Sequence, residues 1–113
     1  MAFSVRSEIT PQGIAKITLI GDLDGSSAPL FKAEVEKVAL DSTKRLVLLM
    51  KELNYLASAG IRVLVFAKQK MGATVDIYVV APQDQIRETL EMTGLQNSLV
   101  VMKRYETARI ETL

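Results

Sequence analysis

The sequence predicts a single α/β domain built on a mixed, mainly parallel β-sheet with helices packed on it. Its 113 residues are 49% hydrophobic and 24% charged, which is the size and balance of one globular domain with one core. Short apolar runs alternate along the chain with segments of helical periodicity, and Pro, Gly and Ser residues separate them. The predicted order of elements is β-β-α-β-α-β-α-β-α.

The chain is expected to begin with a β-hairpin. Apolar residues alternate with polar or small residues over 3–9 and again over 14–20, which is typical of strands with one buried face. Pro11 and Gly13 between the two segments are typical of a turn. A loop is expected to follow over 21–27.

The first helix is expected to begin next to Ser26 or Ser27, because a serine hydroxyl can cap a helix and Pro29 is tolerated in a first turn. Its buried face is predicted to carry Phe31, Val35 and Val38.

A second helix is expected to begin at Ser58 and to end before Gly72. Its inward-facing residues are predicted to be Ile61, Leu64, Val65 and Met71. Its solvent side is predicted to carry Arg62, Lys68, Gln69 and Lys70.

Two central strands are expected over 45–50 and 74–80. The first is a short apolar run without alternation, which indicates a strand covered on both faces, as in parallel sheets, and the second is also rich in apolar residues. Pro82 is predicted to open a third helix that runs through Met92 and stops at Gly94. A short strand over 99–102 and a terminal helix over 105–111 complete the prediction.

A functional site is expected where the parallel strands end. Strands joined through a helix normally run parallel, so their carboxyl ends share one edge of the sheet. Three loops, over 22–25, 54–58 and 81–84, are therefore expected to meet at this edge, where open α/β sheets place their binding sites. Ser58 stands at a predicted helix N-terminus in the middle of them.

Ser58 has two compatible interpretations. Its hydroxyl can cap the helix by accepting from the amide of Gly60 or Ile61. An uncovered helix start that carries a hydroxyl also tolerates a phosphate, because free amides and the positive dipole end favour negative charge. Gly60 is expected to allow a tight turn after Ala57 or the close approach of a neighbouring backbone.

Composition argues against several classes of function. Fourteen basic and thirteen acidic residues give a net charge of +1, and there is no Trp, so neither a general basic surface nor a base-stacking surface for nucleic acid is expected. The absence of Cys and His removes thiolate nucleophiles and the commonest general base and metal ligand. We expect no catalytic residue, metal or cofactor, and a cytoplasmic protein without membrane insertion.

The segment Leu-Asn-Tyr-Leu-Ala-Ser-Ala-Gly-Ile-Arg-Val-Leu at 53–64 resembles the signature of STAS domains, the bacterial anti-sigma factor antagonists. Three further segments, 21–24, 28–31 and 86–95, resemble the same family in the right order. The resemblance covers nearly the whole chain and implies a STAS-like fold, with one STAS domain over residues 1–113.

The resemblance implies a partner switch. In that family a serine kinase, itself the anti-sigma factor, phosphorylates the serine that Ser58 matches, and a metal-dependent serine phosphatase removes the phosphate. The unphosphorylated antagonist binds the kinase and frees the sigma factor, so this chain is expected to be a substrate and binding partner, not an enzyme. The residues expected to contact partners are Asp22, Asp24, Tyr55, Ala57, Ser58, Ala59, Gly60 and Arg62.

One departure from the family leaves alternatives open. Ala57 stands where the family has an aspartate before the acceptor, which implies either a different kinase or a constitutively active antagonist. A second alternative is a STAS interaction subunit of a stress-signalling particle or a lipid-transport complex. A third is a small enzyme or nucleotide-binding module using Asp22 and Asp24, which are more often turn residues without a His or a third carboxylate nearby.

Overall fold

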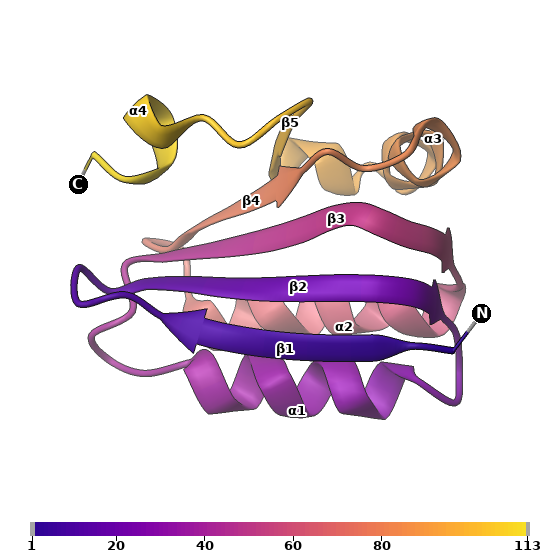
Figure 1. Cartoon of the computed structure of the whole chain (residues 1–113), viewed down its shortest axis with the longest axis horizontal. Helices are drawn as coiled ribbons and strands as arrows, with labels where there is room; N and C mark the ends of the chain where they lie inside the picture. Colours follow the sequence, from indigo (N-terminus) through magenta and orange to yellow (C-terminus); the bar gives the residue numbers. More distant parts are fainter. Residues whose placement is uncertain (1, 113) are drawn as a thin grey trace.

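A computed structural model describes residues 2–112 of the chain, and a single five-stranded sheet with the order β1-β2-β3-β4-β5 forms its centre (Figure 1). β1 and β2 pair antiparallel, and the three other neighbouring pairs are parallel. The predicted hairpin and the predicted mainly parallel sheet are therefore confirmed. The strands are β1 (Ser4–Ile9), β2 (Ile14–Leu23), β3 (Arg45–Leu56), β4 (Asp76–Val80) and β5 (Val100–Met102).

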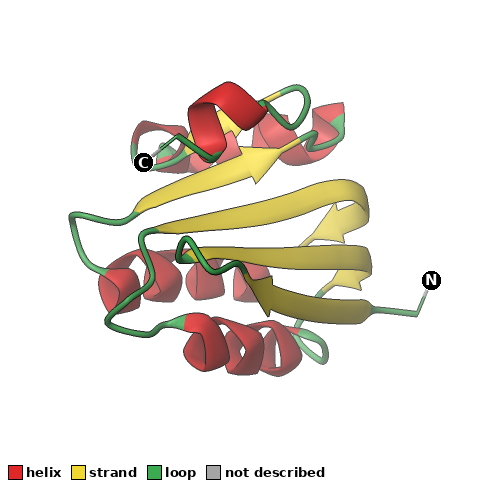
Figure 2. Cartoon of the chain, turned by 60° about the vertical axis from the view of Figure 1, so that its left-hand side comes forward, coloured by secondary structure: helices red, strands yellow, loops and turns green. Residues whose placement is uncertain are grey.

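Helices link the parallel strands, and two of them lie side by side beneath the sheet (Figure 2). These two, α1 and α2, follow β2 and β3 respectively. The predicted alternation of strands and helices is confirmed. The helices are α1 (Ala28–Val38), α2 (Ser58–Met71), α3 (Asp84–Thr93), the short 3₁₀ helix η1 (Leu95–Asn97) and α4 (Thr107–Ile110).

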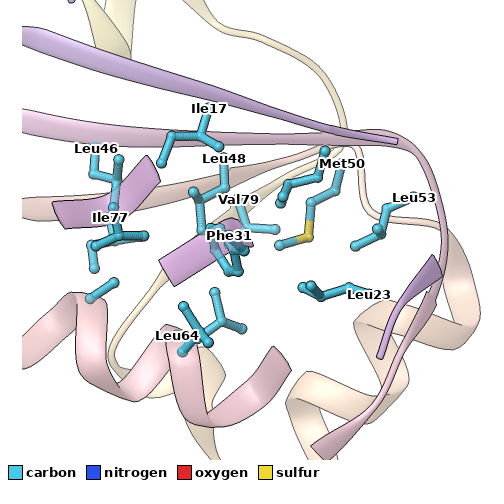
Figure 3. Close-up of a cluster of buried hydrophobic side chains, with 14 of the residues drawn as sticks. Ile17, Leu23, Phe31, Leu46, Leu48, Met50, Leu53, Leu64, Ile77 and Val79 are labelled. Carbon is cyan, nitrogen blue, oxygen red and sulfur yellow. The ribbon is translucent and has the colours of Figure 1, made fainter. Parts of the chain in front are cut away.

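The larger of two hydrophobic clusters fills the space between the sheet and α1, α2 and α3. Figure 3 shows the wholly buried Phe31 of α1 among strand residues such as Leu48 and near Leu64 of α2. The buried face predicted for the first helix, including Val35 and Val38, is confirmed. A smaller cluster on the other face of the sheet contains Ile14, Val47, Tyr78, Val80, Met102 and Ile110. In the segment 45–50, Leu46 and Leu48 are buried on one face and Val47 on the other, as predicted, whereas Leu49 is only half-buried.

β2 and β3 are longer than the sequence predicts. β2 continues to Leu23 through part of the expected loop, and β3 continues to Leu56 rather than ending at residue 50. Register shifts near Thr18 and Gly21 let the two strands stay paired through these irregular ends. The candidate site consequently begins directly at two paired strands.

The phase predicted for α2 is partly wrong. Leu64 is buried as expected, but Val65 is 40% exposed, whereas Val63 and Ala67 are buried. Ile61 is half-buried, which places it at the margin of the inward face. The face of the helix that packs on the sheet therefore includes the small residues Gly60 and Ala67, which let it lie close to the strands.

Four elements near the carboxyl end also have boundaries that differ from the prediction. α3 begins at Asp84 rather than at Pro82, because Gln83 still has an extended backbone (ψ 155°). Gly94 ends α3 in the left-handed conformation, as predicted. β4 and β5 each begin later than predicted, and the terminal helix is confined to Thr107–Ile110.

Candidate functional site

The site lies where β2 and β3 end side by side. Asp22 pairs with Tyr55 and Leu23 with Leu56 in the parallel register. The amide of Ala57 then donates to the carbonyl of Leu23 at 2.8 Å, and α2 starts at the next residue. The loop after β2 and the start of α2 are thereby held together at one edge of the sheet, as the sequence predicts.

Ser58 is exposed and is the first residue of α2. The N-cap is Ala57, whose carbonyl accepts from the amides of Gly60 at 2.9 Å and Ile61 at 3.1 Å. No side-chain hydrogen bond caps this helix within residues 2–112. The prediction that the Ser58 hydroxyl caps the helix is therefore wrong, because Ser58 lies one position inside it. The hydroxyl stands on the surface instead of supporting the helix.

Gly60 determines how closely α2 approaches the strands. It is buried, and a β-carbon there would lie 2.7 Å from Cγ of Leu23 and 2.7 Å from Cδ1 of Leu56. Real β-carbons essentially never come so close to other heavy atoms. The close approach predicted at Gly60 is present, but side chains rather than a neighbouring backbone make it.

The carboxylate of Asp24 is occupied by its own loop. Its Oδ1 accepts from the amide of Ser26 at 3.0 Å, the hydroxyl of Ser26 at 2.8 Å and the amide of Ser27 at 3.1 Å. The hydrogen bond from the Ser26 hydroxyl, followed by those from Ser27, holds the pKa of Asp24 below its usual value. Asp24 is thus an ionised turn residue, which agrees with the simpler of its two sequence-based interpretations.

Ser27 closes the same loop from inside. It is buried, and its hydroxyl donates to the carbonyl of Asp22 at 2.8 Å and accepts from the amide of Asp24 at 2.8 Å. The amide of Ala28 donates to the carbonyl of Asp24, also at 2.8 Å, and α1 starts there. Ser27 was predicted only as a candidate helix cap. It is the N-cap residue of α1, but its hydroxyl makes no cap hydrogen bond and instead fixes the loop that faces the start of α2.

Amide side chains join the third loop and the start of α3 to Asn54 of the second loop. Nε2 of Gln83 donates to Oδ1 of Asn54 at 3.1 Å, and Nε2 of Gln85 donates to the carbonyl of Asn54 at 2.7 Å. The expected meeting of three loops is therefore present. Neither glutamine was singled out from the sequence, because nothing local to α3 indicates that its start lies against β3.

Exposed side chains surround Ser58. Tyr55 is 54% exposed, and Arg62 lies one helical turn beyond Ser58 on the surface of α2. A shallow groove between α1 and α2 contains Lys32, whose ammonium lies 4.8 Å from the ring centroid of Phe66. The α1 contribution was not predicted, because the sequence does not reveal that α1 and α2 are neighbours.

Residues 2–112 contain neither a candidate metal site nor a candidate membrane-spanning helix. Over residues 2–112, no group of three or more His, Cys, Asp or Glu side chains is placed to hold a metal ion. In the same part of the chain, no helix has the length and apolar character needed to cross a membrane.

The fold is that of anti-sigma factor antagonists of known structure. An anti-sigma factor antagonist from Mycobacterium paratuberculosis superposes with a TM-score of 0.86 at 21% identity, covering 98% of this chain and 96% of that one. The antagonist SpoIIAA in its unphosphorylated form gives a TM-score of 0.75 at 14% identity, covering 96% of each chain. Bacillus SpoIIAA in the phosphorylated form gives 0.71 at 17% identity, covering 97% of each.

The family model of the STAS domain matches residues 8–108. The chain belongs to the STAS domain family, as the resemblance in its sequence indicates. A curated relative, the anti-sigma-F factor antagonist RsfB of Mycobacterium tuberculosis, is 26% identical over 86 residues, which cover 76% of this chain and 70% of the relative. That the domain extends over all of residues 1–113 stays a prediction.

Proposed function

We propose that this chain is an anti-sigma factor antagonist that binds an anti-sigma factor serine kinase and is released when Ser58 is phosphorylated. The observation that carries the proposal is the exposed hydroxyl of Ser58 at the start of α2, outside the helix cap and beside the Asp24 loop. The similarity of the chain to anti-sigma factor antagonists supports this class of function.

The proposed partner surface centres on the strand ends and the first turns of α2. Tyr55 and Arg62 are exposed there, and Tyr and Arg are enriched among residues that dominate binding energy. Gly60 is buried, so it supports the surface by its packing and does not present a side chain to the partner. The proposed contact residues on this surface are Asp22, Asp24, Tyr55, Ala57, Ser58, Ala59 and Arg62.

Phosphorylation of Ser58 would act on binding and leave the fold intact. A phosphate adds about −1.5 to −2 charge units at neutral pH, and the start of a helix accommodates such a charge. The ionised Asp24 loop on the same edge adds to the negative charge that a partner surface shaped for a hydroxyl must desolvate. In this cytoplasmic switch, a metal-dependent serine phosphatase restores the binding form, and the chain itself catalyses nothing.

Ala57 favours a second candidate function. It occupies the N-cap of α2 with an extended backbone (φ −87°, ψ 169°) and supplies no side-chain cap. Because the family carries a carboxylate at this position, the kinase meets a different surface next to Ser58. A STAS subunit of another assembly, such as a stress-signalling particle or a lipid-transport complex, would use Ser58 as a fixed contact without phosphorylation.

Affinity capture with the tagged chain from its native cells, followed by phosphorylation of the purified chain, distinguishes the two functions. Recovery of a kinase with the histidine-kinase-like ATPase fold that modifies wild-type protein and the Ser42→Ala control, but not Ser58→Ala, supports the switch. Ser42 is an exposed serine just before β3, at the other end of the strands. Recovery of transporter subunits, or modification that survives Ser58→Ala, would reject the switch.

A further inference from the structure

Within residues 2–112, the second face of the sheet is covered by a helix only at the amino end of its parallel strands. α4 lies over that end (Figure 1), where Ile110 packs in the smaller cluster with Ile14, Val47 and Tyr78. The guanidinium of Arg45 donates to the carbonyls of Arg109 and Ile110 and holds α4 in place. Since α4 is only four residues long, the carboxyl half of this face has no helix over it.

A row of paired residues crosses the half of this face that has no helix over it. Arg6 pairs with Thr18, Thr18 with Leu49, Leu49 with Val80, and Val80 with Met102. The row therefore crosses the whole sheet, over four strand spacings or about 19 Å. A groove follows it, with Leu49, Val80 and the ring of Tyr105 among its lining residues.

Positive charge is concentrated along this groove. Arg6 lines it on β1, Lys51 on β3, and Lys103 and Arg104 directly after β5, against one acid, Glu52. Elsewhere the chain has ten basic and twelve acidic residues, so the groove is basic although the rest of the molecule is slightly acidic. None of the four cations forms an ion pair within residues 2–112. The adjoining Glu8 lies opposite Lys16 in the register of β1 and β2.

We propose that this groove binds an extended acidic peptide segment of a partner protein, with acidic residues at its ends and apolar residues in its middle. Arg6 at one end of the row and Lys103 and Arg104 at the other match the acids. The half-buried Leu49 and Tyr105, which line the groove, match the apolar centre. An extended chain of about six residues at roughly 3.3 Å each spans the row. A single metabolite-sized anion would reach only one end.

The groove is independent of the Ser58 surface. Leu49 faces away from α1 and α2, whereas its neighbour Leu48 belongs to the larger cluster between the sheet and those helices. A partner can therefore occupy the groove while another contacts the start of α2. The groove could bind such a segment whether or not Ser58 is phosphorylated, and equally in a STAS subunit of another assembly.

The test is a titration of the ¹⁵N-labelled full chain with the capped peptide Asp-Glu-Leu-Val-Glu-Asp, followed by amide chemical shifts. We expect shifts at Arg6, Thr18, Leu49 and residues 103–105. The variant Lys103→Glu/Arg104→Glu should weaken binding by about tenfold, because two attractions become repulsions. The matched control Lys37→Glu/Lys70→Glu changes two exposed lysines on α1 and α2 and should leave binding unchanged.

Four outcomes would overturn the proposal. They are an absence of shifts at millimolar peptide, shifts confined to α1 and α2, equal binding of the neutral peptide Asn-Gln-Leu-Val-Gln-Asn, and displacement of the peptide by an equal concentration of inorganic phosphate. A thermal melt of each variant separates loss of binding from loss of the fold, because all four substituted side chains are exposed.

Discussion

Gly60 of α2 lies so close to Leu23 of β2 that a β-carbon on the glycine would be 2.7 Å from Cγ of the leucine. Leu23 also accepts the amide of Ala57 through its carbonyl. The last residue of β2 therefore holds the residue before α2 and determines how near the helix can come. These two contacts set the position of Ser58 at the edge of the sheet.

Gly60→Ala should destabilise the protein by about 1–3 kcal/mol, the usual cost of forcing an extra carbon into a packed core. The added methyl group would contact Leu23 and Leu56, so the start of α2 must move outward. Urea unfolding measures the change in the free energy of unfolding.

Gly25→Ala is the matched control. Gly25 is exposed on the neighbouring loop, and a β-carbon there would meet no atom within 4 Å. Its free energy of unfolding should stay within about 0.5 kcal/mol of wild type. If both variants unfold at the same urea concentration as wild type, the packing described for Gly60 is not rigid.

Ala57→Asp should stabilise the protein by about 1 kcal/mol, because Ala57 has the extended backbone of an N-cap and no side chain to accept from the first-turn amides. Ala57→Asn supplies the same acceptor without a charge, so it separates capping from the helix dipole and from repulsion by Asp24. Thermal and urea unfolding of the two variants measure the effect. A loss of stability in both would mean that the loop at Asp24 leaves no room for the cap.

The edge of the sheet that carries the site could be predicted because short sequence signals determine where the helices begin and end. Pro29, Gly72 and Gly94 mark where helices begin or end, and parallel connections then bring the strand ends to one edge. The ends of β2 and β3 could not be predicted, because polar residues such as Asp22 and Glu52 resemble a loop while register shifts keep them paired.

The finer features of the site depend on tertiary packing. Val65 was predicted to face inward, but the buried Gly60 and Ala67 show that small residues define the inward stripe of α2. A pattern based on large apolar residues assigns such a helix the wrong phase. The groove across the sheet was not predictable either, because Arg6 and Val80 meet in one row only once the strand order is known.

Ser26→Ala should raise the pKa of Asp24 toward the usual aspartate value, because the hydroxyl of Ser26 is the largest cause that lowers it. A carboxylate whose pKa is lowered by folding stabilises the folded protein at pH values above its unfolded pKa of about 3.9. This stabilisation is lost as the pH falls through the folded pKa. The variant should therefore be less stable than wild type at pH 7 and lose less stability on acidification. Urea unfolding at neutral and acidic pH and a carboxyl NMR titration of Asp24 measure both effects.

Ser42→Ala is the control for this comparison, since Ser42 is exposed and lies away from the Asp24 loop. It should leave the titration of Asp24 unchanged. An Asp24 midpoint that is the same in wild type and in Ser26→Ala would contradict the assignment of the hydrogen bond as the cause.

Phosphorylated Ser58 should keep the thermal stability of the protein nearly unchanged and weaken its binding to the kinase. The added charge stands at the exposed first residue of α2, where the dipole favours it. At a partner surface the same charge must be desolvated next to the Asp24 loop, which costs several kcal/mol by the usual estimates for unpaired interfacial charges, roughly 2–5. Calorimetry with enzymatically phosphorylated protein measures both quantities.

Ser58→Asp carries a smaller charge on a shorter group, so its affinity should fall less than that of the phosphorylated protein. Ala57→Asp provides the decisive comparison, because it restores the family's acid next to the acceptor while Ser58 stays in place. If the kinase modifies this variant but not wild type, Ala57 makes the natural protein a constitutive antagonist. If phosphorylated wild type binds the kinase as tightly as the unmodified protein, phosphorylation of Ser58 does not control binding, and the proposed switch is wrong.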